Sequence, residues 1–188
     1  MSIPRKSLSA AFAIALAAGT VSVVAPTASA AADGSNVVIN EVYGGGGNKG
    51  SVYSNDFVEL FNPTDKPIDI TGWKIEQYSA KGGLGTGHPH VLDGVIQPKS
   101  FFLVQGAAGN NDTGNFANKA DQELNFNFSG KEATAKLLDA NEQVVDLVGW
   151  GTAKNFEGSR PAAATTNDTS VQRNTDGADS DDNGADFF

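Results

Sequence analysis

After residue 30, this sequence predicts an all-β protein whose antiparallel strands form a sandwich with Greek-key connections. Short apolar runs alternate with clusters of Gly, Pro, Asn and Asp, which are the residues that favour turns. No eleven-residue window there carries the i, i+3, i+4, i+7 apolar stripe of an amphipathic helix. Roughly seven or eight short strands fit into this part of the chain, a number typical of two packed sheets.

The expected strands are separated by turn residues along the chain. They cover residues 36–43, 57–62, 68–78 with a break at Gly72, 90–96, 101–105, 134–138, 144–150 and 170–173. Residues 139–142 are expected to form a hairpin connection, and residues 97–99 another tight corner. The Gly- and Asn-rich segments 44–54, 82–89 and 106–121 are expected to be exposed loops.

The strand at residues 57–62 carries apolar side chains on both faces. Val58 and Leu60 share one face, while Phe57 and Phe61 share the other. A strand with this pattern is expected to be central in its sheet and covered on both sides.

The two tryptophans lie at strand positions. Trp73 and Ile75 point the same way, while Lys74 and Glu76 point to the opposite face, so Trp73 is expected in the core. Trp150 lies between two glycines and fits either a core position or an aromatic platform for a ligand.

The first 30 residues have the pattern of a secretory signal peptide. Arg5 and Lys6 precede an apolar run, and Ala28 and Ala30 provide the small residues of a cleavage site after Ala30. The alternative is an uncleaved membrane anchor, because the run approaches the length of a spanning helix. We expect a secreted, extracellular protein with no membrane span after cleavage. Residues 31–35 would be a linker, 36–174 the sandwich domain and 175–188 an acidic C-terminal segment.

The chain is acidic and lacks cysteine. It has 13 basic and 22 acidic residues, a net charge of −9, and loss of the leader with its two basic residues would leave −11. Nucleic acid is therefore an unlikely partner, since binding to phosphate backbones depends on Lys and Arg. The absence of cysteine excludes disulfides, thiolate catalysis and cysteine-bound metals.

Several segments, in this order and spacing, resemble the bacterial lamin-tail domain family. They are VVINEVYGGGGNKG at residues 37–50, NDFVELFNPTDKPIDITGWKIE at 55–76, VIQPKSFFLVQG at 95–106, VDLVGWG at 145–151 and SVQRNTDGADSDDNGADF at 170–187. The resemblance implies a compact immunoglobulin-like β-sandwich. Exported bacterial relatives often carry this domain beside nucleases, phosphatases or other hydrolases, whereas this chain is expected to be a stand-alone secreted member. The family implies no catalytic residues.

The acidic end contains the strongest candidate for a metal site. Asp179, Asp181 and Asn183 follow the D-x-D-x-N-G spacing that opens a calcium loop, and Asp186 could add a further oxygen. The chain ends before the position of the closing Glu of an EF-hand loop. These four residues are the expected calcium ligands, and calcium is the one cofactor suggested. The alternative is a solvated acidic tail.

Three weaker patterns have ordinary structural interpretations. Residues 45–50 satisfy G-x-G-x-x-G, but a strand rather than a helix follows, so a flexible loop is expected instead of a dinucleotide site. His88 and His90 could form a metal clip with Asp93, or a polar loop. Glu41 and Glu59 could be an acid/base pair, but structural hydrogen bonds are the expected role.

These observations favour an exported, non-catalytic module that binds an unknown protein, glycan or cell-surface partner. The alternative is a metal-dependent hydrolase or nuclease that uses His88, His90 or the acidic residues 179–186, or a nucleic-acid-binding accessory module. No nucleophile with an adjacent base is evident in the sequence, so the chain is not expected to be an enzyme.

Overall fold

A computed structural model describes residues 33–110 and 119–188. The expected signal peptide, residues 1–30, lies outside the described residues, as does the middle of the expected loop at 106–121. Within the described part, no helix has the length and apolar character required to cross a membrane.

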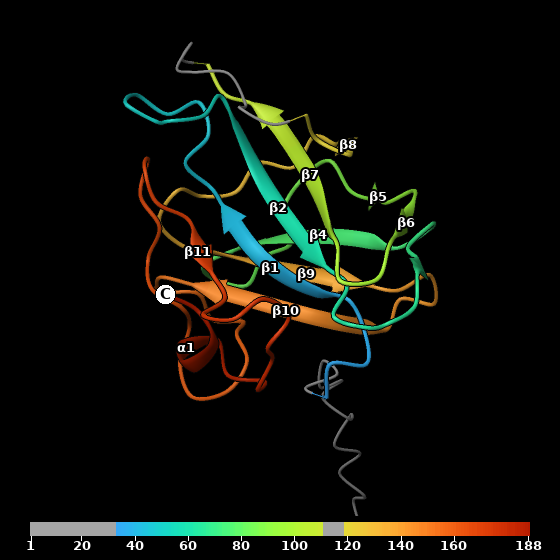
Figure 1. The fold of residues 1–188 in the computed structure, drawn as a ribbon. Helices are drawn as coiled ribbons and strands as arrows, with labels where there is room; N and C mark the ends of the chain where they lie inside the picture. The colour runs from blue at the N-terminus through green and yellow to red at the C-terminus, as the bar shows by residue number, and fades with distance from the viewer. Residues whose placement is uncertain (1–32, 111–118) are drawn as a thin grey trace, which may run out of the picture.

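The described residues form a β-sandwich, which confirms the expected fold class (Figure 1). One sheet contains, in spatial order, β11 (Val171–Gln172), β1 (Val38–Tyr43), β2 (Asn55–Phe61), β7 (Phe101–Ala108) and β8 (Gln122–Glu123). The other contains β10 (Val144–Trp150), β9 (Ala133–Leu138), β4 (Lys74–Ser79) and β5 (His90–Val91). A small ribbon pairs β3 (Ile68–Asp69) with β6 (Val95–Ile96). Every strand pair is antiparallel except β7 with β8, which is parallel.

The core lies between the two sheets and is built from the inward face of each strand. Val58 and Leu60 of β2 are fully buried there, and β2 is central in its sheet, as predicted. Trp73 and Trp150 both belong to this core, and Trp150 has no exposed surface. Trp150 is therefore a core residue and not an exposed platform for a ligand.

The strand predictions fail mainly where turns are short. The expected strand 68–78 is two strands, because Gly72 adopts a φ of 82° between β3 and β4. The expected strand 90–96 is likewise divided into β5 and β6, and β8 was not predicted. The hairpin at residues 139–142 does join β9 to β10, as expected.

The first residues of the expected loop 44–54 are packed against the fold, whereas residues 48–50 are exposed as predicted. Gly44, Gly45 and Gly47 are buried. A Cβ atom on Gly46 would lie 2.1 Å from the carbonyl carbon of Asn55, so the backbone approaches closer than any other residue allows. No helix follows the segment, which excludes the dinucleotide-binding interpretation.

The acidic C-terminal segment folds back onto the sandwich. Residues 183–186 form the short helix α1 (Asn183–Asp186), and Asp182 caps it by accepting a hydrogen bond from Gly184 N. Phe187 is 5% exposed, and its backbone forms an antiparallel β-bridge with Arg173, the residue that follows β11. The alternative of a solvated acidic tail is therefore wrong.

Candidate functional site

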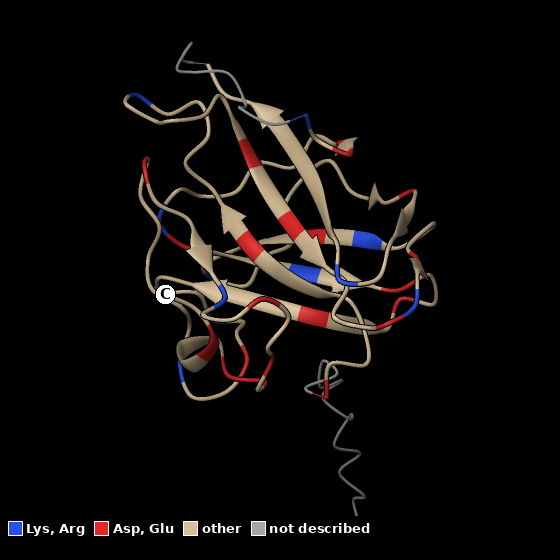
Figure 2. Cartoon of the chain, viewed as in Figure 1, with Lys and Arg blue, Asp and Glu red and all other residues tan. Residues whose placement is uncertain are grey.

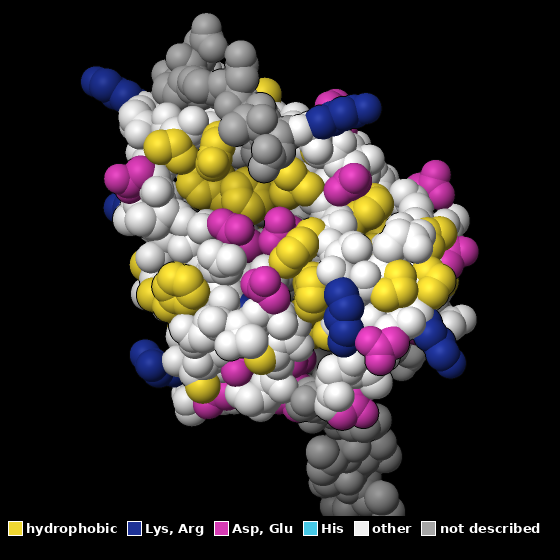
Figure 3. All heavy atoms as spheres, viewed as in Figure 1, with side chains coloured by type: hydrophobic (Ala, Val, Ile, Leu, Met, Phe, Trp, Pro, Cys, Tyr) yellow, Lys and Arg dark blue, Asp and Glu magenta, His cyan; other side chains and the backbone are white. Residues whose placement is uncertain are grey.

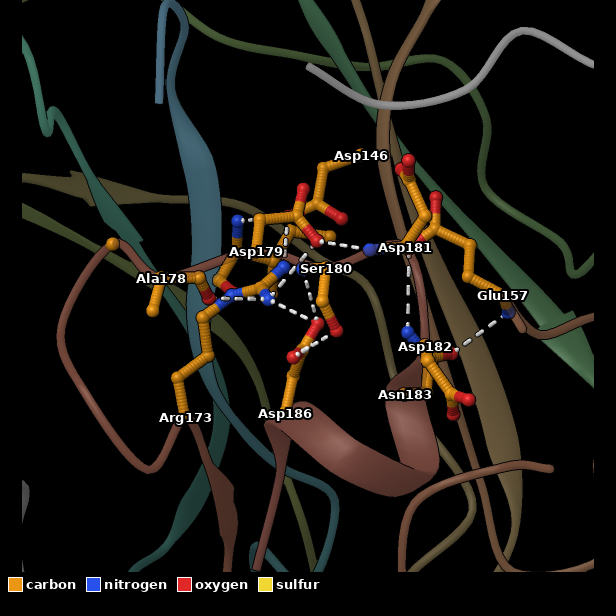
Figure 4. A network of polar contacts seen from close by, with 12 residues as sticks. Asp146, Glu157, Arg173, Ala178, Asp179, Ser180, Asp181, Asp182, Asn183 and Asp186 are labelled. Carbon is orange, nitrogen blue, oxygen red and sulfur yellow. Dashed lines mark hydrogen bonds and ion pairs between the residues drawn. The ribbon is translucent and has the colours of Figure 1, made fainter. Parts of the chain in front are cut away.

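Arg173 organises a cluster of acidic side chains at the end of the sandwich where α1 lies. It follows β11, and its guanidinium is fully buried. Its Nη2 lies 2.9 Å from Asp146 Oδ2, and its Nη1 lies 3.3 Å from Asp179 Oδ1 and 3.2 Å from Asp186 Oδ2. Figure 4 shows Arg173 reaching between these carboxylates and the carbonyl group of Ala178.

Arg173 also holds the backbone of the first strand. Its Nε donates to Ile39 O, and Ile39 N in turn donates to Asp146 Oδ2. The guanidinium lies over the ring of Phe187, and Arg173 Cζ is 4.6 Å from the ring centroid. One side chain therefore ties β1, β10 and the C-terminal segment together.

Asp146 is a charged residue in the middle of an apolar strand. It lies in β10 at a register irregularity in the pairing with β9, and it is fully buried. Burial raises the pKa of its carboxyl group to about 6, although Arg173 acts in the opposite direction. Its two oxygens accept hydrogen bonds from Ile39 N, Leu147 N and Arg173.

Glu157 joins the cluster from the loop that follows β10. Burial and the nearby carboxylates of Asp146, Asp179 and Asp181 raise the pKa of Glu157 to about 9. Its Oε2 accepts a 3.3 Å hydrogen bond from Asn183 Nδ2. Among the described residues, the carboxylates of Asp146, Glu157 and Asp179 form the one set of three that places ligand atoms within 4.8 Å of one another.

The four expected calcium ligands have different environments. Asp179 lies in this three-carboxylate set. Asn183 is fully buried, and its Oδ1 accepts hydrogen bonds from Gly149 N and Glu157 N. Asp186 accepts hydrogen bonds from Arg173 and from Ser180. Asp181 lies near the cluster, and its backbone N–H donates to Asp179 Oδ1. The structure therefore joins Asp179 to Asp146 and Glu157 rather than to Asn183 and Asp186.

Sequence reasoning missed Asp146, Glu157 and the role of Arg173. Asp146 does carry a signal, because an acidic residue inside the apolar run VVDLVGW must be paired if that strand is buried. Glu157 carries none, since it lies in a loop far from the acidic segment in the sequence.

His88 and His90 are close together, with ring centroids 4.6 Å apart. Burial lowers the pKa of His90, and the neighbouring His88 lowers it further. Neither histidine belongs to a group of three metal-ligating side chains among residues 33–110 and 119–188. Asp93, the possible third ligand of such a clip, accepts a hydrogen bond from Thr71.

Glu41 and Glu59 are directly opposite each other on β1 and β2. Each is engaged by a neutral side chain: Glu41 accepts a bond from Ser170 Oγ, and Glu59 accepts one from Asn40 Nδ2. Burial raises the pKa of both carboxyl groups. The expected role in structural hydrogen bonds is therefore confirmed.

A family model described as the lamin tail domain matches residues 30–152. The chain belongs to the lamin tail domain family. The sandwich of this lamin tail domain is the immunoglobulin-like fold that the resemblance implied. No curated protein matches the chain. The family match includes Asp146 but ends before Glu157, Arg173 and Asp179, so most of the acidic cluster lies beyond the matched residues.

Proposed function

We propose that this lamin tail domain is an exported, non-catalytic binding module whose recognition surface is the outer face of the five-stranded sheet. The observation that carries the proposal is the side-chain arrangement on that face. Strand register places Tyr43 opposite Phe57 and Glu41 opposite Glu59. An aromatic row and an acidic row therefore run side by side across β1 and β2, where Figure 2 shows adjacent acidic bands.

The aromatic row is extended by packing. The rings of Tyr43 and Phe57 stack at 5.5 Å, and Tyr53 meets them edge-on at 5.7 and 6.2 Å. Beyond the acidic row, Phe61 packs on Phe101 at 4.7 Å. Phe101 remains 44% exposed. Figure 3 shows hydrophobic side chains gathered next to acidic ones on this side of the molecule.

The chemistry of this face suits a protein segment that carries Lys or Arg. Two opposed carboxylates repel each other, and their pKa values are raised, so a cation between them would relieve that repulsion. Of the neighbouring rings, Phe101 is exposed and Tyr53 partly exposed, so these two offer apolar surface and ring faces to a cationic segment. Tyr43, Phe57 and Phe61 are buried and pack against them. The net charge of −9 also favours encounter with a basic partner.

Export is supported by the signal-peptide pattern of residues 1–30. The test is expression of the full chain and of residues 31–188 in a bacterial host, followed by detection in the medium and in cell fractions. We expect export of the full chain only, with a mature N-terminus after Ala30. Retention of both forms inside the cell contradicts the proposal.

The binding surface is tested by capture from exported and envelope fractions. The immobilised domain is compared with a variant that carries Glu59→Gln and Phe101→Ser. The control carries Val91→Ser and Glu142→Gln on the four-stranded side, where Val91 is 40% exposed. We expect the first variant alone to lose a captured protein with a basic binding segment. Equal capture by all three forms counts against this surface, and capture of a glycan instead contradicts the choice of partner.

A further inference from the structure

The cluster of Asp146, Glu157 and Asp179 has a property that the fold does not require. The three carboxylates come from β10, from the following loop and from the segment before α1. Their ligand atoms nevertheless lie within 4.8 Å of one another. Like charges at this separation repel strongly where burial reduces screening by water.

Arg173 offsets only part of that charge. Its single positive charge is shared among Asp146, Asp179 and Asp186. Glu157 is not among the ion pairs of Arg173, and its contact with Asn183 is a hydrogen bond from a neutral amide. The side of the cluster that faces Glu157 therefore carries more negative than positive charge.

One oxygen in the cluster is left without a partner. The side chain of Asp179 has no exposed surface, and its Oδ2 finds no hydrogen bond within the described part of the chain. Its other oxygen accepts from Arg173 and from Asp181 N. Figure 4 shows the carboxylate of Asp179 turned toward that of Asp146. A buried carboxylate oxygen without a donor is costly unless a cation or proton contacts it.

We propose that Asp146, Glu157 and Asp179 bind a single Ca²⁺ ion, with Asp179 Oδ2 as one of its ligands. An all-oxygen donor set favours a hard cation over zinc or copper. Ca–O bonds of about 2.3–2.6 Å let one ion reach oxygens up to about 5 Å apart, whereas Mg²⁺ with bonds of about 2.0–2.1 Å requires a tighter set. Water would complete the shell of six to eight oxygens.

The position of Glu157 leaves the site accessible. Glu157 is only partly buried, so the ion could enter from its side of the cluster.

This site uses none of the residues of the proposed binding surface on the outer face of β1 and β2. It also differs from the calcium loop expected from the sequence, because Asn183 and Asp186 are held by the backbone and by Arg173. Asp179 is the one residue common to both.

The test is the melting temperature of the purified protein in EDTA and in 10 mM Ca²⁺, with NaCl at equal ionic strength as the salt control. Calcium sites of exported modules have dissociation constants on the order of 0.1–1 mM, so we expect a rise of about 3–10 °C. Isothermal titration with Ca²⁺ should give one ion per chain. Equal melting in EDTA and Ca²⁺ overturns the proposal, and a larger rise with Mg²⁺ overturns the choice of calcium.

Glu157→Gln is the decisive variant. Glutamine has the shape of the protonated acid and can still accept the hydrogen bond from Asn183, so the variant is expected to fold and to melt in EDTA like the parent. It should lose the response to Ca²⁺. Glu123→Gln, at an exposed position of β8, is the matched control and should keep the response. A full response in Glu157→Gln, or its loss in Glu123→Gln, contradicts the assigned ligands.

Discussion

Arg173 and Asp146 form an ion pair in which Nη2 lies 2.9 Å from Oδ2, and both side chains are fully buried. The pair connects the residue that follows β11 to the centre of β10 in the opposite sheet. Two charges removed from water in this way stabilise a fold only through their mutual contact and their hydrogen bonds. Loss of either partner leaves the other charged and buried.

Replacement of Arg173 by methionine should therefore strongly destabilise the fold. Arg173→Met removes the cation that contacts Asp146, Asp179 and Asp186, and we expect a loss of about 3–5 kcal/mol in the free energy of unfolding. Urea denaturation measures it. Lys74→Met, which breaks the exposed pair of Lys74 with Glu142, is the control and should cost less than about 1 kcal/mol. Similar losses in the two variants would show that the buried cluster has no special role.

Gly46→Ala should disrupt the junction between the glycine segment and β2. The new Cβ atom would lie 2.1 Å from Asn55 C and 2.2 Å from Asp56 N, both of them backbone atoms in a central strand. We expect a loss of about 2–4 kcal/mol in thermal or urea unfolding. Gly83→Ala is the control, since its nearest neighbour is Ser79 Oγ at 3.4 Å. A loss of less than about 0.5 kcal/mol for Gly46→Ala would mean that this segment can move freely.

Asp56 should make stability depend on pH. Burial raises its pKa to about 7, although hydrogen bonds from Gly46 N and Phe128 N act in the opposite direction. Between about pH 4 and 7 the unfolded chain releases this proton while the folded chain keeps it, so stability falls as pH rises through that window. A shift of this size corresponds to about 4 kcal/mol at most.

The measurement is the free energy of unfolding between pH 4 and 8 for the parent and for Asp56→Asn. Other buried carboxylates contribute the same slope to both proteins, so the difference between the two curves isolates Asp56. We expect the variant to show a shallower decline. Parallel curves would place the pKa of Asp56 near its ordinary value.

Asn62 should be essential for the turn after β2. Its buried amide donates to Lys66 O, Ile96 O and Gln97 O, while Oδ1 accepts from Thr64 N. Asn62→Asp should lower the free energy of unfolding by about 2 kcal/mol or more, roughly the loss of two buried hydrogen bonds. The reason is that a carboxylate, which cannot donate, would face three carbonyl oxygens. Thr64→Ala, compared by chemical denaturation, should cost about 1 kcal/mol or less. The reverse order of the two losses would contradict this account of the turn.

Much of the fold could be predicted from local pattern. Apolar residues on both faces of 57–62 identify a central strand, because a strand covered on both sides must be apolar at most positions, and β2 is central in its sheet. Gly72 was a visible break, but its positive φ makes it a sharp turn between two sheets rather than an irregularity within one strand. The two-residue strand β8 was missed because two residues carry no periodicity.

The acidic cluster could be predicted only in part. The D-x-D-x-N-G spacing correctly drew attention to Asp179, yet spacing implies ligands that are close in sequence. The structure instead uses Asp146 and Glu157, which are brought to Asp179 by the packing of the C-terminal segment on β10. Glycine content similarly indicated flexibility at residues 44–47, where close backbone packing is the physical reason for glycine.

The central claim is that the acidic end is part of the lamin tail domain, held there by Arg173. Amide hydrogen exchange at residues 171–188 tests it most directly. We predict protection of Arg173 N, Asn183 N and Phe187 N comparable to that of β10, since these groups donate to Asn40 O, Glu157 O and Asn183 O. Exchange of these amides at the rate of an unstructured peptide, while β10 stays protected, would contradict the claim.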